Sequence, residues 1–400
     1  MGTDVVTSAL RPFLAAVMLL LTAGQSWGQV SFELLDAPDR GRWADFSLSR
    51  DGKNMGCLLG GAVYWWTAAD GFRFLDEGSP NQGGVGMSAT GNALIAAREI
   101  DGGTVPTIWF LGGSTVDIGF LADECRTIVH ADLGYDLNAD GTMAVGQSTT
   151  CDAATGFVWT RDQGLLGLPH GLADDSRASA VSADGRTVVG FCDHPVTGFR
   201  RPALWRDGQG PILFLGPDRA GEALNISLNG GLVVGQAEMG GISPQAFLWV
   251  EGNEPVGLGN LSGKGTDASL ASAVSDDGKV VGWSGDELWS DQEAFIWTAQ
   301  AGMRSLAGIL AENGVDIPEG LNLTGALDIS GDGITVVGVG RDQAWNQRYW
   351  RIRLDRSLDH APVAVTRPWN RDRVVPASPD SIEIHRAEVL HPFPFGKRRY

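Results

Sequence analysis

The sequence lacks the short motifs that identify most common enzyme and cofactor sites. It contains no HExxH, no paired CxxC, no calcium-binding loop, no nucleophile elbow and no phosphate-binding loop. The histidines have no metal-ligand spacing, so no metal or cofactor is expected. Basic side chains are also scarce, with 30 Lys and Arg against 48 Asp and Glu. The resulting net charge of −18 argues against a protein built to hold nucleic acid or an anionic membrane.

Long apolar runs are scarce too. One run covers residues 13–23, about half of the roughly 20 residues that a membrane-spanning helix needs. It follows Arg11 and precedes the small residues Ser26 and Gly28, which is the layout of a secretory signal peptide over 1–28. An uncleaved N-terminal anchor is the alternative. The mature chain is therefore expected to be a secreted, periplasmic or cell-envelope protein without stable membrane insertion.

The other end of the chain differs in composition from the middle. Residues 351–400 hold ten basic and six acidic side chains, whereas the region 29–350 has a net charge near −22. Segment 355–400 is predicted to be a flexible, basic C-terminal tail.

Glycine and tryptophan are abundant, with 56 and 14 residues, and they follow an internal repeat. A tetrapeptide close to Ser-x-Asp-Gly returns seven times, with a mean step of about 47 residues between its glycines, which is close to the length of a four-stranded propeller blade. Such a tetrapeptide suits a tight hairpin turn. The seven copies are SRDG (49–52), SATG (88–91), NADG (138–141), SADG (182–185), SLNG (227–230), SDDG (275–278) and SGDG (330–333).

Short strands surround each turn. An apolar strand precedes it, a β-branched run ending in glycine follows it, and a third strand carries a tryptophan that we expect in the core between blades. These tryptophans are Trp66, Trp109, Trp159, Trp205, Trp249, Trp297 and Trp350. A fourth strand completes each unit, and one helix is expected near 306–313. The sequence thus predicts an all-β fold, a seven-bladed β-propeller of four-stranded antiparallel blades over 29–354, with residues 30–35 as the outer strand of the last blade.

The repeat resembles a known family. The units AVSADGRTVVG (180–190) and AVSDDGKVVG (273–282), the latter followed by AFIWT (294–298), resemble the extracellular repeat of the HAF family, and residues 305–340 are similar to its closing repeat. The resemblance covers about residues 40–354. It implies an exported, propeller-like repeat protein and supplies no catalytic residue. Blades one and two depart from the pattern, with Cys57 and Ala96 where the strand-end glycine is expected.

The loops after the second and fourth strands of each blade open on the rim opposite the Ser-x-Asp-Gly turns. Binding residues are expected there, because function favours variable loops. Three tryptophans there lie outside the repeated position, among carboxylates, an arrangement that holds sugars or peptides. The alternative is that these tryptophans fold back on their own blades. The predicted ligand-binding residues are Trp283, Trp289, Trp345, Asp193, Glu287 and Arg200.

Four cysteines in an exported chain suggest disulfides. Cys125 and Cys151 are assigned to the same face and form the predicted bridge, with Cys192 as the competing partner. Cys57 is expected to stay buried as a small apolar residue.

These observations favour an exported scaffold that binds a protein or polysaccharide partner through its rim loops. One alternative is a propeller hydrolase or lyase that acts on extracellular polysaccharide with carboxylates from several blades. A purely structural envelope component is the third possibility. Convergent carboxylates with an aromatic floor at the centre of the ring favour the enzyme, whereas a plugged centre favours binding.

Overall fold

The computed structural model describes residues 30–38, 44–78, 83–101, 103–121, 130–149, 153–171, 173, 175–216, 219–286 and 291–355. The predicted signal peptide and almost all of the predicted tail lie outside these residues. Among the described residues, no helix has the length and apolar character needed to cross a membrane.

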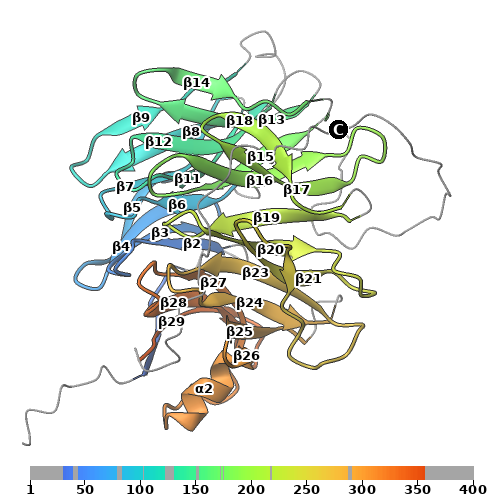
Figure 1. The fold of residues 1–400 in the computed structure, drawn as a ribbon. Helices are drawn as coiled ribbons and strands as arrows, with labels where there is room; N and C mark the ends of the chain where they lie inside the picture. Colours follow the sequence, from blue (N-terminus) through green and yellow to red (C-terminus); the bar gives the residue numbers. More distant parts are fainter. Residues whose placement is uncertain are drawn as a thin grey trace, which may run out of the picture.

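The described chain forms a seven-bladed β-propeller, as the repeat predicts (Figure 1). Blade 1 contains β2 (Ala44–Leu48), β3 (Asn54–Leu59), β4 (Ala62–Thr67) and β5 (Gly71–Glu77); blade 2 contains β6 (Val85–Met87), β7 (Ala93–Ile100), β8 (Gly103–Phe110), β9 (Thr115–Asp117) and β10 (His130–Ala131). Blade 3 contains β11 (Leu133–Leu137), β12 (Met143–Thr149), β13 (Ala154–Thr160) and β14 (Gly164–Gly167); blade 4 contains β15 (Ser176–Val181), β16 (Thr187–Asp193), β17 (Arg200–Arg206) and β18 (Gln209–Leu213).

The remaining blades follow the same order. Blade 5 contains β19 (Gly221–Ile226), β20 (Leu232–Ala237), β21 (Gln245–Val250) and β22 (Val256–Gly257), and blade 6 contains β23 (Ala268–Val274), β24 (Val280–Gly285), β25 (Glu293–Thr298) and β26 (Gly302–Ser305). Blade 7 contains β27 (Asn322–Ile329), β28 (Thr335–Arg341), β29 (Gln347–Arg353) and the N-terminal β1 (Ser31–Leu34). Helix α2 (Leu306–Glu312) lies where the sequence predicts a helix, next to β25 and β26 (Figure 1).

The N-terminal strand closes the ring as predicted. Strand β1 pairs antiparallel with β29, and the amide of Leu35 donates a 2.9 Å hydrogen bond to the carbonyl of Tyr349. Val30 and Leu35 flank the strand and are both buried, but in two different cores, one between blades 6 and 7 and one between blades 7 and 1. The strand therefore connects the two ends of the described ring.

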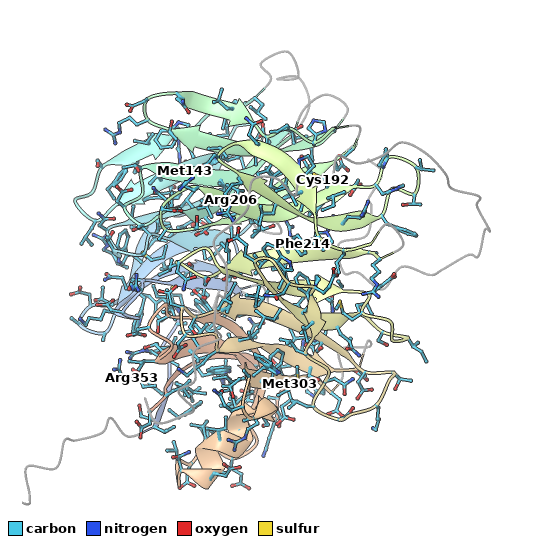
Figure 2. All side chains as sticks on the ribbon, viewed as in Figure 1. Met143, Cys192, Arg206, Phe214, Met303 and Arg353 are labelled. Atoms are coloured by element: carbon cyan, nitrogen blue, oxygen red, sulfur yellow. The ribbon has the colours of Figure 1, made fainter. Side chains whose placement is uncertain are left out.

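The hydrophobic core consists of seven clusters, one at each blade–blade interface, and side chains fill the spaces between the sheets (Figure 2). Each cluster holds or contacts one of the seven predicted tryptophans. The prediction that they occupy one equivalent position is wrong for Trp350. Trp350 pairs with Gly338, the strand-end glycine of blade 7. Trp297 of blade 6 pairs instead with Val280, two residues before the strand-end glycine Gly282. Phe295 takes the Trp350 position in blade 6, opposite Gly282.

The strand-end glycines have a specific packing role. In blades 3 to 7 the inner strand carries a β-bulge directly opposite the glycine, and the bulge brings a backbone carbonyl against it. A Cβ atom on Gly190 or Gly282 would lie 1.8 Å from that oxygen. Blades 1 and 2 pair their inner strands in unbroken register at this point, and there Cys57 and Ala96 replace the glycine. The two apparent departures from the repeat thus follow from the absence of the bulge.

Candidate functional site

The turn rim of the ring is closed by the Ser-x-Asp-Gly turns themselves. Each turn donates a hydrogen bond to the next blade, and the seven steps form a complete circle. The bonds run from Arg50 N to Ala89 O, Thr90 N to Ala139 O, Ala139 N to Ala183 O, Ala183 N to Leu228 O, Asn229 Nδ2 to Asp276 O, Asp276 N to Gly331 O, and Asp332 N to Arg50 O. The turns, predicted as hairpin devices, therefore also join the blades.

Side chains on this rim also join blades that are not neighbours. Arg50 of blade 1 forms a 2.9 Å ion pair with Asp276 of blade 6, although blade 7 lies between them. Leu228 of blade 5 reaches Gly331 of blade 7, where a Cβ would lie 2.5 Å from its Cδ1. Both contacts pass over the turn of the blade that lies between the two partners.

Half-buried carboxyl groups lie on three of the inner strands. Asp45, Asp136 and Asp328 come from blades 1, 3 and 7, and each accepts one backbone N–H from its own strand and one from the neighbouring blade. Asn225 of blade 5 likewise accepts the amide of Val274 in blade 6. These side chains connect blades, and their hydrogen-bonding capacity is directed at backbone amides.

Burial raises the pKa of these carboxyls, to about 6 for Asp45, about 7 for Asp136 and about 8 for Asp328. The backbone hydrogen bonds act in the opposite direction but are outweighed by the loss of hydration. Repulsion from Asp45 and Asp136 further raises the pKa of Asp328.

A first prediction concerns pH. The folded Asp328 carboxyl holds its proton up to a pH of about 8, while the unfolded one ionises near pH 4, so stability falls as the pH rises through this window. Asp328→Asn should flatten this fall, because the amide does not ionise; it should also lower stability at pH 5 by about 1–3 kcal/mol, because one of the two backbone N–H groups loses its acceptor. Thermal melts from pH 5 to pH 9 measure it, with exposed Asp316→Asn as the charge-matched control. Equal pH slopes for Asp328→Asn and wild type would contradict the assignment.

The opposite rim carries the predicted ligand-binding residues. Trp283 is half-buried inside strand β24, and its Cβ lies near Gly325 of blade 7. Asp193 is only 4 % exposed at the end of β16. Trp289 and Glu287 lie outside the described residues. The structure therefore does not bring the predicted set together in one place, because its described members come from blades 4, 6 and 7.

Arg200 belongs to a buried charge network that sequence reasoning missed. Glu222 accepts hydrogen bonds from Arg200 and from Arg177, the latter at 2.8 Å. Both guanidinium groups also lie close to the Phe191 ring, with Arg200 4.4 Å and Arg177 5.1 Å from its centroid. The two cations hold the pKa of Glu222 below its usual range despite the burial that acts to raise it. Arg200, predicted as a ligand-binding residue, therefore makes its contacts with Glu222 and Phe191 inside the protein.

Trp345 has the properties expected of a ligand platform. Its side chain is 61 % exposed at the tip of the β28–β29 loop, and its backbone adopts φ = 62°, a left-handed conformation that is rare for bulky residues. The Arg341 guanidinium lies 5.4 Å from its ring centroid. Other exposed apolar residues on this rim are Val196, Phe199 and Ile242, at the ends of the blade 4 and blade 5 loops.

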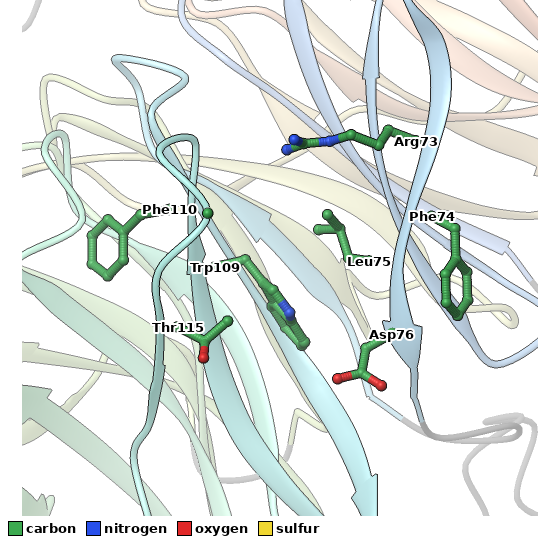
Figure 3. Close-up of a pocket in the computed structure, with 8 residues that line it drawn as sticks. Arg73, Phe74, Leu75, Asp76, Trp109, Phe110 and Thr115 are labelled. Carbon is green, nitrogen blue, oxygen red and sulfur yellow. The ribbon is translucent and has the colours of Figure 1, made fainter.

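A separate cavity of about 250 Å³ lies at the outer edges of blades 1 and 2 (Figure 3). Its lining includes Leu75, Asp76 and Trp109, together with Arg73, Phe74, Phe110, Gly113 and Thr115. None of the described ligand-binding candidates from the sequence lies in it. Arg98 bridges Asp76 and Asp117 next to this lining.

The predicted disulfide between Cys125 and Cys151 falls outside the described residues and stays a prediction. Cys192, the competing partner, is a buried free thiol with a pKa raised to about 12 by burial. Cys57 is fully buried in the core between blades 7 and 1, as predicted.

Comparison with known proteins supports the architecture. No family model and no curated protein matches the sequence. Among solved structures, the β-propeller domain of the trilobed protease from Pyrococcus furiosus matches 81 % of this chain and 93 % of its own, with 11 % identity and a TM-score of 0.54. A prolyl endopeptidase matches 81 % of this chain and 48 % of its own, with 9 % identity and a TM-score of 0.51. A protein described as a TolB from Agrobacterium tumefaciens matches 82 % and 98 %, with 13 % identity and a TM-score of 0.43. What this chain shares with the first two is the propeller fold.

Proposed function

We propose that this protein is an exported binding scaffold whose loop rim engages an extracellular or periplasmic partner, and that it belongs to the HAF repeat family. The observation that carries the proposal is Trp345, an exposed indole held in a left-handed conformation at a loop tip. Such backbone strain costs about 1–3 kcal/mol, and strained residues cluster at ligand-binding and switch sites. The turns of the other rim are joined to one another by hydrogen bonds between blades, so the proposed site is on the loop rim.

Two features weigh against the hydrolase or lyase alternative. The inner-strand carboxyls Asp45, Asp136 and Asp328 accept hydrogen bonds from backbone amides with both of their oxygens. The exposed pair at the blade 1 and blade 2 edge, Asp76 and Asp117, shares an ion pair with Arg98. A glycoside hydrolase requires one protonated and one ionised carboxyl that both reach substrate.

The test is a binding screen of the full chain against a broad panel of polysaccharides and glycans. We expect at least one reproducible hit, weakened tenfold or more by Trp345→Ala, because stacking on the indole supplies much of the binding free energy. Leu166→Ala, which truncates a half-exposed side chain on outer strand β14, is the matched control and should bind as wild type. If no glycan binds, a protein becomes the favoured partner. If a glycan binds and Trp345→Ala does not weaken its binding, Trp345 is not part of the site.

A further inference from the structure

The loop that presents Trp345 is preorganised by one carboxylate. Asp342 Oδ1 accepts the amides of Ala344 and Asn346, both at 2.9 Å, while its Oδ2 accepts the guanidinium of Arg348 at 2.7 Å. The amide of Trp345 donates a 2.9 Å bond to the Asp342 carbonyl. The backbone that carries the indole is thus fixed before any ligand arrives, which lowers the entropy cost of binding.

Arg341 adds a charge to this platform. The residue is exposed, and among the residues that the structure describes no carboxylate forms an ion pair with it. The nearest acid in the loop, Asp342, is occupied by Arg348 and by the turn. A guanidinium of this kind, placed over an aromatic ring, retains donors for an incoming anion.

These two groups recognise different parts of one chemical unit. An indole face stacks on the apolar face of a sugar ring, and a guanidinium forms paired hydrogen bonds with a carboxylate. The net charge of the body, near −22, repels an extended polyanion, so the proposal requires Arg341 to attract the acidic sugar locally. We propose that Trp345 and Arg341 form a subsite for an acidic polysaccharide, with the sugar ring on the indole and its carboxylate on Arg341. This inference rests on the proposed function and names its ligand class.

The test compares two polymers with one backbone, polygalacturonate and its fully methyl-esterified form, by calorimetric titration of the full chain. We expect polygalacturonate to bind at least tenfold more tightly, because esterification removes the carboxylate. Arg341→Gln should weaken polygalacturonate binding about three- to tenfold and leave the ester unaffected, and Trp345→Ala should weaken both. Arg353→Gln, an exposed arginine at the other end of blade 7, is the matched control. Melting temperatures check folding, and Trp345→Ala should melt no lower than wild type.

The outcomes separate the two proposals. The acidic-sugar subsite would be overturned if both polymers bound with equal affinity and Trp345→Ala weakened both. It would also be overturned if only neutral glycans of the panel bound. In either case the proposed binding site on the loop rim would stand. Arg341-dependent binding of poly-glutamate without binding of polygalacturonate would replace the sugar with an acidic peptide. If Trp345→Ala binds both polymers as tightly as the wild type does, the subsite and the proposed rim site are both wrong.

Discussion

Deletion of residues 29–37 is expected to lower the melting temperature by about 10 °C. The deletion removes the pairing of β1 with β29 and the buried side chains of Val30 and Leu35. Each buried side chain contributes about 1.5–3 kcal/mol, so the total loss is about 5 kcal/mol with the hydrogen bonds included. In a ring of this size 1 kcal/mol corresponds to about 2 °C. Differential scanning calorimetry of the full chain and the deletion measures the effect.

Point variants separate the latch from a general effect of truncation. Val30→Ala and Leu35→Ala should each lower the melting temperature, since each residue packs in a different blade–blade core. Leu34→Ala on the same strand should have little effect, because Leu34 is 41 % exposed. A deletion that melts with the wild type would show that β1 does not close the ring.

Gly282→Ala is expected to destabilise the protein by about 3 kcal/mol or more, or to prevent folding. Its Cβ would lie 1.8 Å from the carbonyl oxygen of Leu270 and 3.0 Å from the ring of Phe295, and neither the bulged backbone nor the buried ring can move away cheaply. Chemical denaturation gives the free energy of unfolding. Gly112→Ala is the matched control, because nothing lies within 4 Å of the added Cβ. If both variants unfold alike, the bulge does not require the glycine.

The sequence predicts the architecture well because the repeat is local. Turn, strand and aromatic spacing recur within about 47 residues, so the blade count, the helix near 306–313 and the β1 latch follow from the pattern alone. Relations between blades could not be predicted in this way. The register of Trp350, the circle of turn hydrogen bonds and the pairing of Asp328 with Leu48 join residues far apart in the chain.

The candidate site was predicted only in part, for a similar reason. A tryptophan outside the repeated position identifies Trp345 correctly as an exposed residue, but the same rule assigns Trp283, which is half-buried in a strand, to the ligand-binding set. Composition cannot distinguish the two, because exposure depends on packing against the next blade. The left-handed backbone of Trp345 and its contact with Arg341 appear only in three dimensions. A basic residue four positions before a loop tryptophan is the signal that could have suggested them.

Hydrogen–deuterium exchange of the full chain, alone and with the strongest binder from the glycan panel, tests the central claim most directly. The amides of 341–348 are predicted to exchange more slowly in the presence of the ligand, while the Ser-x-Asp-Gly turns on the opposite rim remain unchanged. Protection confined to those turns, or to the cavity lined by Leu75 and Trp109, would contradict a ligand site on the loop rim.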